Sequence, residues 1–176
     1  TRLVRKEDLP TSYEGFLARK EWKGRVAIDT GDQHWLSGMF QHYGEERARQ
    51  LIKDIVATLD PVVHDGHLAL ARSVGAGEYV VALNNYMNLT FNVAMNGAPT
   101  DIFVLDPVTV HMVPVGVSAN APHPNAAKLF LEYLISKEGQ TIFQKADYFP
   151  TRSDVPASMP ELAPSTGGFK AVVMSP

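Results

Sequence analysis

The chain has no cysteine among its 176 residues. Disulfides, thiolate metal ligands and a thiol nucleophile are therefore excluded. The absence of cysteine fits a bacterial periplasmic or extracellular protein, but many cytosolic proteins also lack cysteine. A P-loop, a G-x-G-x-x-G sequence and a G-x-S-x-G nucleophile motif are missing as well. Because no pattern of catalytic residues is present, we expect a protein that is not an enzyme.

Long apolar runs and clustered positive charge are also lacking. No run approaches the roughly 18 residues that a membrane-spanning helix needs. The formal net charge is -3, without a basic stripe, so nucleic acid is not an expected partner. Hydrophobic residues make up 45% of the chain, enough for the core of one globular domain or one large lobe. The sequence starts without Met or an apolar leader, so we expect any signal peptide to lie outside it.

Helical and strand patterns alternate along the chain. The apolar spacing predicts helices at 33–43, 45–59, 67–74, 88–95, 126–135 and 136–146. It predicts strands at 25–29, 62–64, 79–83, 101–105, 108–118 and 169–174. Such alternation indicates an α/β fold with a mixed, mostly parallel sheet flanked by helices. Phe130 and Tyr133 lie on the apolar stripe of one helix, and we interpret them as core residues.

Three strand-to-helix junctions are polar, and they are the candidate binding site. They comprise Thr30, Gly31 and Asp32; Asp65, Gly66 and His67; and Asn84, Asn85 and Tyr86. In parallel sheets, ligands bind beyond the carboxyl ends of the strands, where helix N-termini favour an anion. The asparagine amides can donate hydrogen bonds to such an anion. In the alternative interpretation, Asp65 is only an N-cap, Gly31 only a turn residue and the asparagines only a polar strand exit.

Two other interpretations of these residues remain. Trp35 follows the first junction closely and is a candidate ligand contact. His64 and His67, with Asp32 and His34 elsewhere, suggest a zinc hydrolase site. Zinc sites need three or four ligands in fixed geometry, and this histidine pair straddles a strand end, so we do not favour that site.

Four separated stretches resemble one family. They are DLPTSYEGFLARKEWKGRVAID, VGAGEYVVALNNY, NAPHPNAAKLFLEYLISKEGQ and YFPTRSDV, within residues 3–155. In this order they resemble the extracellular solute-binding proteins of bacterial ABC importers, in the ferric-ion-binding branch. The resemblance implies a lobe of the type II periplasmic-binding-protein fold and a partnership with a membrane permease. It implies a periplasmic or extracellular location, with a lipid anchor as an option in the full-length protein.

The family's ferric site carries an Asn-Asn-Tyr-Tyr run, in which two phenolates bind iron. An asparagine and helix N-termini bind a companion anion there. Asn84, Asn85 and Tyr86 match this run, whereas Met87 stands in place of the second tyrosine. A thioether is a poor ligand for hard Fe(III). The resemblance therefore leaves two cargoes open: Fe(III) with a companion anion, for which Tyr86 is the metal ligand, or an anionic solute without metal.

The resemblance also implies a division of the chain. Residues 1–112 match the C-terminal lobe of a two-lobe protein, 113–150 a segment that returns to the other lobe, and 151–176 an extended C-terminal segment. The N-terminal lobe has no counterpart here, so we expect a fragment that associates with itself or with a partner through surface meant for that lobe. An alternative function is the effector-binding domain of a bacterial transcription regulator, which shares the two-lobe architecture.

Overall fold

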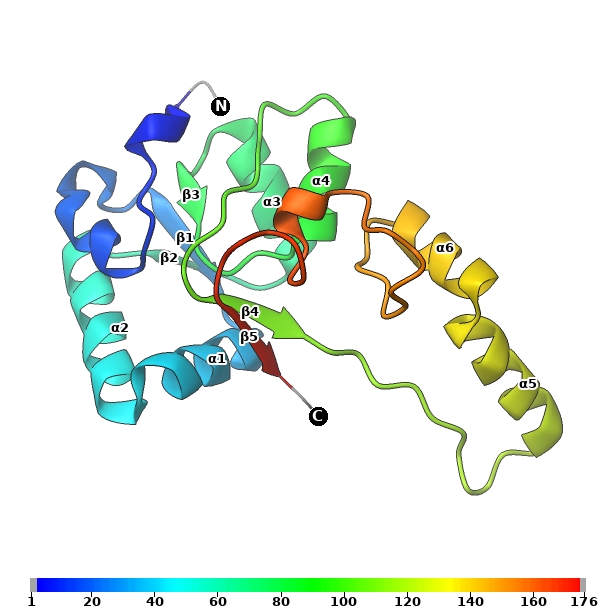
Figure 1. Cartoon of the computed structure of the whole chain (residues 1–176). Helices are drawn as coiled ribbons and strands as arrows, with labels where there is room; N and C mark the ends of the chain where they lie inside the picture. The colour runs from blue at the N-terminus through cyan, green and yellow to red at the C-terminus, as the bar shows by residue number, and fades with distance from the viewer. Residues whose placement is uncertain (1–2, 175–176) are drawn as a thin grey trace. The chain divides into compact units, whose positions relative to one another are not determined.

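The computed structural model describes residues 3–174, which fall into two compact units. The first unit comprises the described residues up to His111 together with Phe169–Met174, and the second comprises Met112–Gly168. Figure 1 labels the α-helices and strands of both units. The first unit contains β1 (Val26–Asp29), α1 (Gln33–Tyr43), α2 (Glu45–Leu59), β2 (Val62–His64), α3 (His67–Ala76), β3 (Val81–Ala82), α4 (Met87–Met95), β4 (Val108–His111) and β5 (Ala171–Met174). It also contains the short 3₁₀ helices η1 (Lys6–Asp8), η2 (Glu14–Ala18) and η3 (Lys20–Trp22).

A parallel sheet with the order β2-β1-β3 forms the centre of the first unit. The central strand β1 is almost entirely apolar, and Val26 and Ala27 are completely buried. A strand covered on both faces requires such a continuous apolar run. Figure 1 shows α1 and α2 on one side of this sheet and α3 and α4 on the other. The α/β fold with parallel strands flanked by helices is therefore confirmed.

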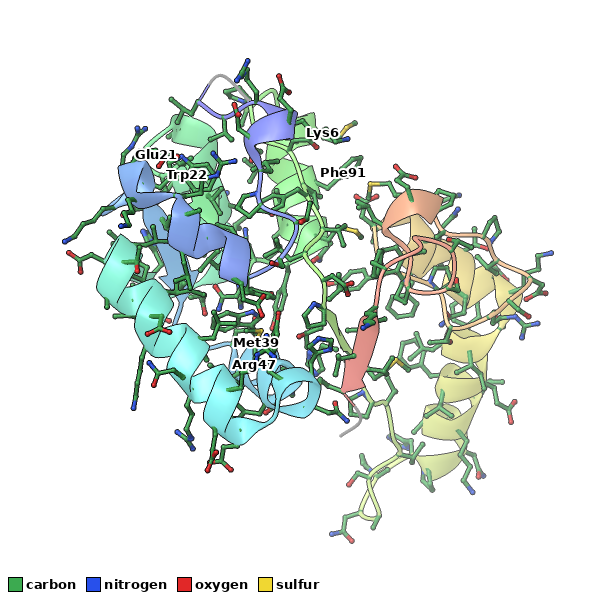
Figure 2. The ribbon with its side chains drawn as sticks, turned by 60° about the vertical axis from the view of Figure 1, so that its left-hand side comes forward. Lys6, Glu21, Trp22, Met39, Arg47 and Phe91 are labelled. Atoms are coloured by element: carbon green, nitrogen blue, oxygen red, sulfur yellow. The ribbon has the colours of Figure 1, made fainter. Side chains whose placement is uncertain are left out.

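The core of the first unit lies mainly between α2, the sheet and the N-terminal 3₁₀ helices. Helix α2 supplies a buried face at helical spacing: Ala48, Leu51, Ile55 and Leu59. Phe16 and Trp22 meet edge-on, with ring centroids 5.9 Å apart. Trp22 and Met39, both labelled in Figure 2, belong to this buried cluster. The helical spacing of apolar residues in the sequence thus predicts α2 itself, whereas the packing partners of its buried face are seen only in the structure.

One predicted strand is absent and others are too long: the strand predicted at 79–83 is reduced to β3, and the strand predicted at 169–174 begins at Ala171. Residues 101–105 form no strand; Leu105 is buried and Phe103 packs against the core without joining a sheet. Their apolar character reflects packing and not a hydrogen-bonded ladder. The strand predicted at 108–118 ends at His111, where pairing with β5 also ends at Met174. Pro114 lies beyond this point and lacks the N–H group that a longer ladder would need.

The second unit contains α5 (Pro124–Ile135), α6 (Lys137–Lys145) and the 3₁₀ helix η4 (Pro160–Leu162). Ser136 caps α6 as predicted, because its hydroxyl accepts a hydrogen bond of 3.1 Å from the Gly139 N–H. Helix α5 has no buried residue, and Phe130 is 61% exposed and Tyr133 38% exposed. Their interpretation as core residues is therefore wrong. None of the helices within residues 3–174 is both long and apolar enough to cross a membrane.

Adjacent positions on α2 test the core assignment. Ile55 is 3% exposed, whereas Val56 is 47% exposed. We expect Ile55→Ala to lower the free energy of unfolding by about 2–5 kcal/mol, because the lost methylenes leave a cavity. The matched control Val56→Ala should change it by less than about 0.5 kcal/mol. Urea denaturation of both variants checks this, and equal losses would show that the face is misassigned.

Candidate functional site

The three predicted junctions lie at one edge of the central sheet. Because β2, β1 and β3 are parallel, their carboxyl ends meet there. The loop after β1 leads into α1, the loop after β2 into α3 and the loop after β3 into α4. The structure thus brings together residues that are far apart in the sequence. We call this surface the carboxyl edge.

The carboxyl edge is organised by Asp29, the last residue of β1. Its Oδ1 accepts a hydrogen bond of 2.8 Å from the Gly31 N–H, and its Oδ2 accepts one of 2.7 Å from the Gly66 N–H. The side chain is only 2% exposed. Sequence reasoning missed Asp29 as a site residue. The available signal was a carboxylate at the end of an otherwise apolar central strand, which is costly to bury unless donors surround it.

Asn84 links the third junction to the same residue. The Asp29 N–H donates to the Asn84 Oδ1 at 2.8 Å, and the Asn84 Nδ2 donates to the Asp29 carbonyl at 2.9 Å. Asn84 is 5% exposed. The Asn84 amide thus continues the hydrogen bonding between β3 and β1 beyond the end of β3. Its Oδ1 and one Nδ2 hydrogen are both used in bonds to the Asp29 backbone. This geometry gives Asn84 a structural role in joining the two junctions.

His67 and Tyr86 form the ring pair of the carboxyl edge. Their rings stack with centroids 3.9 Å apart and an interplanar angle of 26°. The His67 Nε2 lies 3.5 Å from the Asp29 Oδ1, while the His67 Nδ1 is buried without a hydrogen-bond partner among the described residues. Burial raises the pKa of the Tyr86 phenol, and the negative charges of Asp32 and Asp29 raise it further. Tyr86 therefore keeps its proton at neutral pH unless a cation displaces it.

Asp32 is the N-cap of α1. Its Oδ1 accepts a hydrogen bond of 2.9 Å from the Trp35 N–H. Burial raises the Asp32 pKa above its ordinary value of 3.8, and the nearby Asp29 charge adds to this. The Trp35 N–H, His67 and His34 act in the opposite direction.

Trp35 lies in the core. Its Nε1 donates to the Tyr13 hydroxyl at 2.9 Å, and burial raises the Tyr13 pKa to about 12. Trp35 also lines a hollow of about 240 Å³ between β1, α1 and α2. The polar residues Asp29, Thr30 and Asp32 lie at this hollow, but its other lining residues are apolar: Ile28, Leu36, Ile52, Ile55, Val56, Pro61 and Leu83.

The remaining predicted residues have mixed positions. Thr30 and Asp65 are exposed, and the Thr30 hydroxyl donates to the His64 carbonyl at 3.2 Å. Asn85 is half-buried; its Nδ2 donates to the Thr90 hydroxyl at 3.0 Å, whereas its Oδ1 is buried without a partner in the described part of the chain. Asp65 is not the N-cap of α3, since Gly66 takes that position with a φ of 101°.

The zinc hypothesis is not supported. The His64 Nε2 is 3.1 Å from the Tyr79 hydroxyl, so His64 has a partner away from His67. Within residues 3–174, no three His, Asp or Glu side chains gather into a group that could hold a metal ion. A metal bound at the carboxyl edge would thus need Tyr86 or ligands from outside this chain.

The first prediction for this edge concerns Asn84. We expect Asn84→Ala to lower the free energy of unfolding by about 1–3 kcal/mol, because the buried N–H and carbonyl of Asp29 lose their partners. Asn92→Ala is a suitable control, since Asn92 is an exposed asparagine on α4. Urea denaturation measures both. If Asn84→Ala were as stable as the control, Asn84 would not join the junctions as described.

The second prediction concerns Asp32. Because its pKa is raised, the contribution of Asp32 to stability is fully present below the ordinary pKa of 3.8 and is lost as pH rises through the folded-state pKa. Asp32→Asn keeps the cap without the charge, so it should be at least as stable as the wild type at pH 7 and lose this pH dependence. Asp32→Ala should lose about 1 kcal/mol from the missing cap. Urea unfolding at pH 4 and pH 7 tests this, and a destabilised Asp32→Asn at pH 7 would contradict it.

Comparison with known proteins assigns the chain to a family. Residues 1–171 match the model of the bacterial extracellular solute-binding protein family. The chain is similar to iron uptake protein A1 of Synechocystis, with 27% identity over 96% of this chain and 50% of that protein. The regulator alternative receives no support from these matches.

Solved structures share the fold. The iron-bound HitA of Pseudomonas aeruginosa has a TM-score of 0.71 at 19% identity, over 96% of this chain and 57% of that one. A Trichodesmium protein in complex with iron and citrate has a TM-score of 0.61 at 26% identity, over 88% of this chain and 54% of that one. The substrate-binding protein of an Agrobacterium tumefaciens ABC transporter has a TM-score of 0.63 at 20% identity, over 98% and 53%. The chain thus spans about half the length of these relatives.

Proposed function

The chain belongs to the bacterial extracellular solute-binding protein family, and we propose that it forms one lobe of the substrate-binding component of an ABC importer whose cargo is ferric ion. An iron uptake protein and a protein in complex with iron and citrate are among its relatives. Another relative is the binding protein of an ABC transporter. A binding protein of this kind delivers its cargo to a membrane permease and carries out no reaction on it. We place it in the periplasm or outside the cell, with a lipid anchor as an option.

The observation that carries this proposal is the position of Tyr86. It is the N-cap of α4 at the carboxyl edge, and its ring is fixed against His67. A phenolate oxygen is a hard ligand that suits Fe(III). Asp29 and Asp32 make the surroundings negative, which raises the pKa of the free phenol but also favours a bound cation. Met87 follows directly and supplies no second phenolate.

The division of the chain is part of the proposal. We propose that residues 1–112 form the C-terminal lobe, that 113–150 return toward the other lobe and that 151–176 are an extended C-terminal segment. The grouping of contacts supports a boundary after His111, although Phe169–Met174 joins the first unit through β5. In this proposal the remaining ligands for iron come from the other lobe. The cargo is then enclosed only when both lobes are present.

An anionic solute bound without metal is the weaker alternative. Such a solute would need free donors at the helix N-termini. At the first two junctions, the N–H groups of Gly31 and Gly66 already donate to Asp29, and the Trp35 N–H donates to Asp32. These contacts favour the ferric cargo over the anion.

The test is a titration of the full-length protein with ferric citrate, followed by the phenolate-to-iron charge-transfer absorption. We expect Tyr86→Phe to reduce this band and to weaken iron binding by on the order of tenfold or more. Because the Tyr86 pKa is raised, iron must displace its proton, so the affinity should increase with pH. The slope should be smaller in Tyr86→Phe by about one proton.

Tyr79→Phe is the matched control, since Tyr79 is a half-buried phenol of the same unit that contacts His64 and not His67. It should keep the band and the pH slope of the wild type. An unchanged band in Tyr86→Phe would falsify the proposed role of this residue. Absence of any band in the wild type would reject the ferric cargo.

A further inference from the structure

We propose that Asp29 is a built-in anion that determines the charge of the ligand that the carboxyl edge accepts. Its carboxylate takes the place of a free oxyanion at the junctions of Gly31 and Gly66, so phosphate, sulfate and free carboxylates are excluded there. This inference rests on the proposed binding function of the carboxyl edge. It makes Asp29 a residue that determines specificity through charge, without itself touching the cargo.

The first support is that the N–H groups which could bind an oxyanion already donate to Asp29. An oxyanion at a helix N-terminus needs N–H groups that point toward it. The N–H groups of Gly31 and Gly66 approach the two carboxylate oxygens of Asp29 at 2.8 and 2.7 Å. These distances are those of good charge-assisted hydrogen bonds. An incoming oxyanion would have to displace a carboxylate that is tethered to β1 and therefore present at very high effective concentration.

The second support is charge. Asp32 is a second buried carboxylate at the same edge, where its Oδ1 accepts from the Trp35 N–H and caps α1. Among the described residues, no Lys or Arg lies within ion-pair distance of Asp29, and its one such neighbour is His67 at 3.5 Å. A bound oxyanion would therefore face two like charges without a compensating guanidinium or ammonium group. Like charges this close disfavour ionised ligands strongly in a poorly solvated site.

The third support is that the other polar groups around Asp29 are also engaged. The Asn84 Oδ1 accepts from the Asp29 N–H, and the Asn84 Nδ2 donates to the Asp29 carbonyl. The Asp29 side chain is 2% exposed, so its oxygens are turned toward the protein and not toward solvent. The Asp29 carboxylate thus occupies the N–H donors of two junctions, and it is not itself available as a ligand for the cargo. Tyr86 remains available at this edge as a ligand for a cation.

The experiment uses the iron-free full-length protein and inorganic phosphate as the probe. Amide resonances are followed by ¹⁵N NMR during the titration, and the affinity is measured by calorimetry. In the wild type we expect the amides of Gly31 and Gly66 to remain unshifted at millimolar phosphate. In Asp29→Ser both N–H groups are freed and one negative charge is lost. This variant should bind phosphate on the order of tenfold tighter or more than the wild type, with shifts at both glycines.

Two further variants separate occupancy from charge. Asp29→Asn keeps the shape and one acceptor oxygen but removes the charge and leaves one of the two N–H groups without an acceptor. It should be folded but less stable than the wild type, and gain phosphate binding of intermediate strength. Asp32→Asn removes a nearby charge without freeing the N–H groups of Gly31 and Gly66, so their amides should stay unshifted. If Asp29→Ser fails to fold, the wild-type resonances and Asp29→Asn still test the inference.

Shifts of the Gly31 and Gly66 amides in the wild type would overturn the inference, as would equal phosphate affinity in the wild type and Asp29→Asn. Because the titration contains no iron, these outcomes are independent of the ferric titration. A protein that fails to bind iron but gains phosphate on loss of Asp29 would reject the proposed cargo and leave the role of Asp29 intact.

Discussion

A carboxylate removed from water has to be surrounded by hydrogen-bond donors, and the donors around Asp29 come from two loops that precede α1 and α3. The Asp29 backbone is joined in addition to Asn84, which precedes α4. One residue at the end of the central strand therefore fixes the relative positions of three loops. Replacing the side chain of Asp29 or of Asn84 leaves buried polar groups without a bond, which costs more than an exposed hydrogen bond contributes.

The same arrangement sets the electrostatics of the carboxyl edge. Two helix N-termini carry partial positive charge, and buried carboxylates of this chain rather than solvent ions lie against them. The N–H groups of these termini donate to Asp29 and Asp32. Burial raises the pKa of the Tyr86 phenol, and the charges of Asp32 and Asp29 raise it further. A phenol held neutral beside two carboxylates is a poor anion receptor and a reasonable ligand for a strongly charged cation. The preference of the carboxyl edge for a cation thus follows from the hydrogen bonds that its carboxylates accept from the backbone N–H groups of the loops.

The second unit presents the opposite situation, an apolar surface without cover. Leu129, Phe130 and Ile135 on α5 are all more than half exposed. Apolar groups of this size on one helix mark a surface that is normally covered by another part of the protein or by a partner. This agrees with our proposal that residues 113–150 return to a second lobe. Gln140 joins α6 to neighbouring segments of this unit, because its Oε1 accepts from the Thr151 N–H and its Nε2 donates to the Leu134 carbonyl.

The sequence by itself determined the α-helices and the family, but not the extent of the strands. The apolar spacing of residues 45–59 and the cap at Ser136 depend on neighbours within a few positions, so their patterns predict helix positions to within a residue or two. The three junctions could also be predicted, since parallel strands end at one edge. Only the tertiary structure decided what those junctions do. Asp29 meets Gly66 at a separation of 37 residues and Asn84 at 55. Such contacts leave no periodic pattern, and whether an N–H group faces a ligand or a buried carboxylate depends on the packing of loops that are distant in the chain.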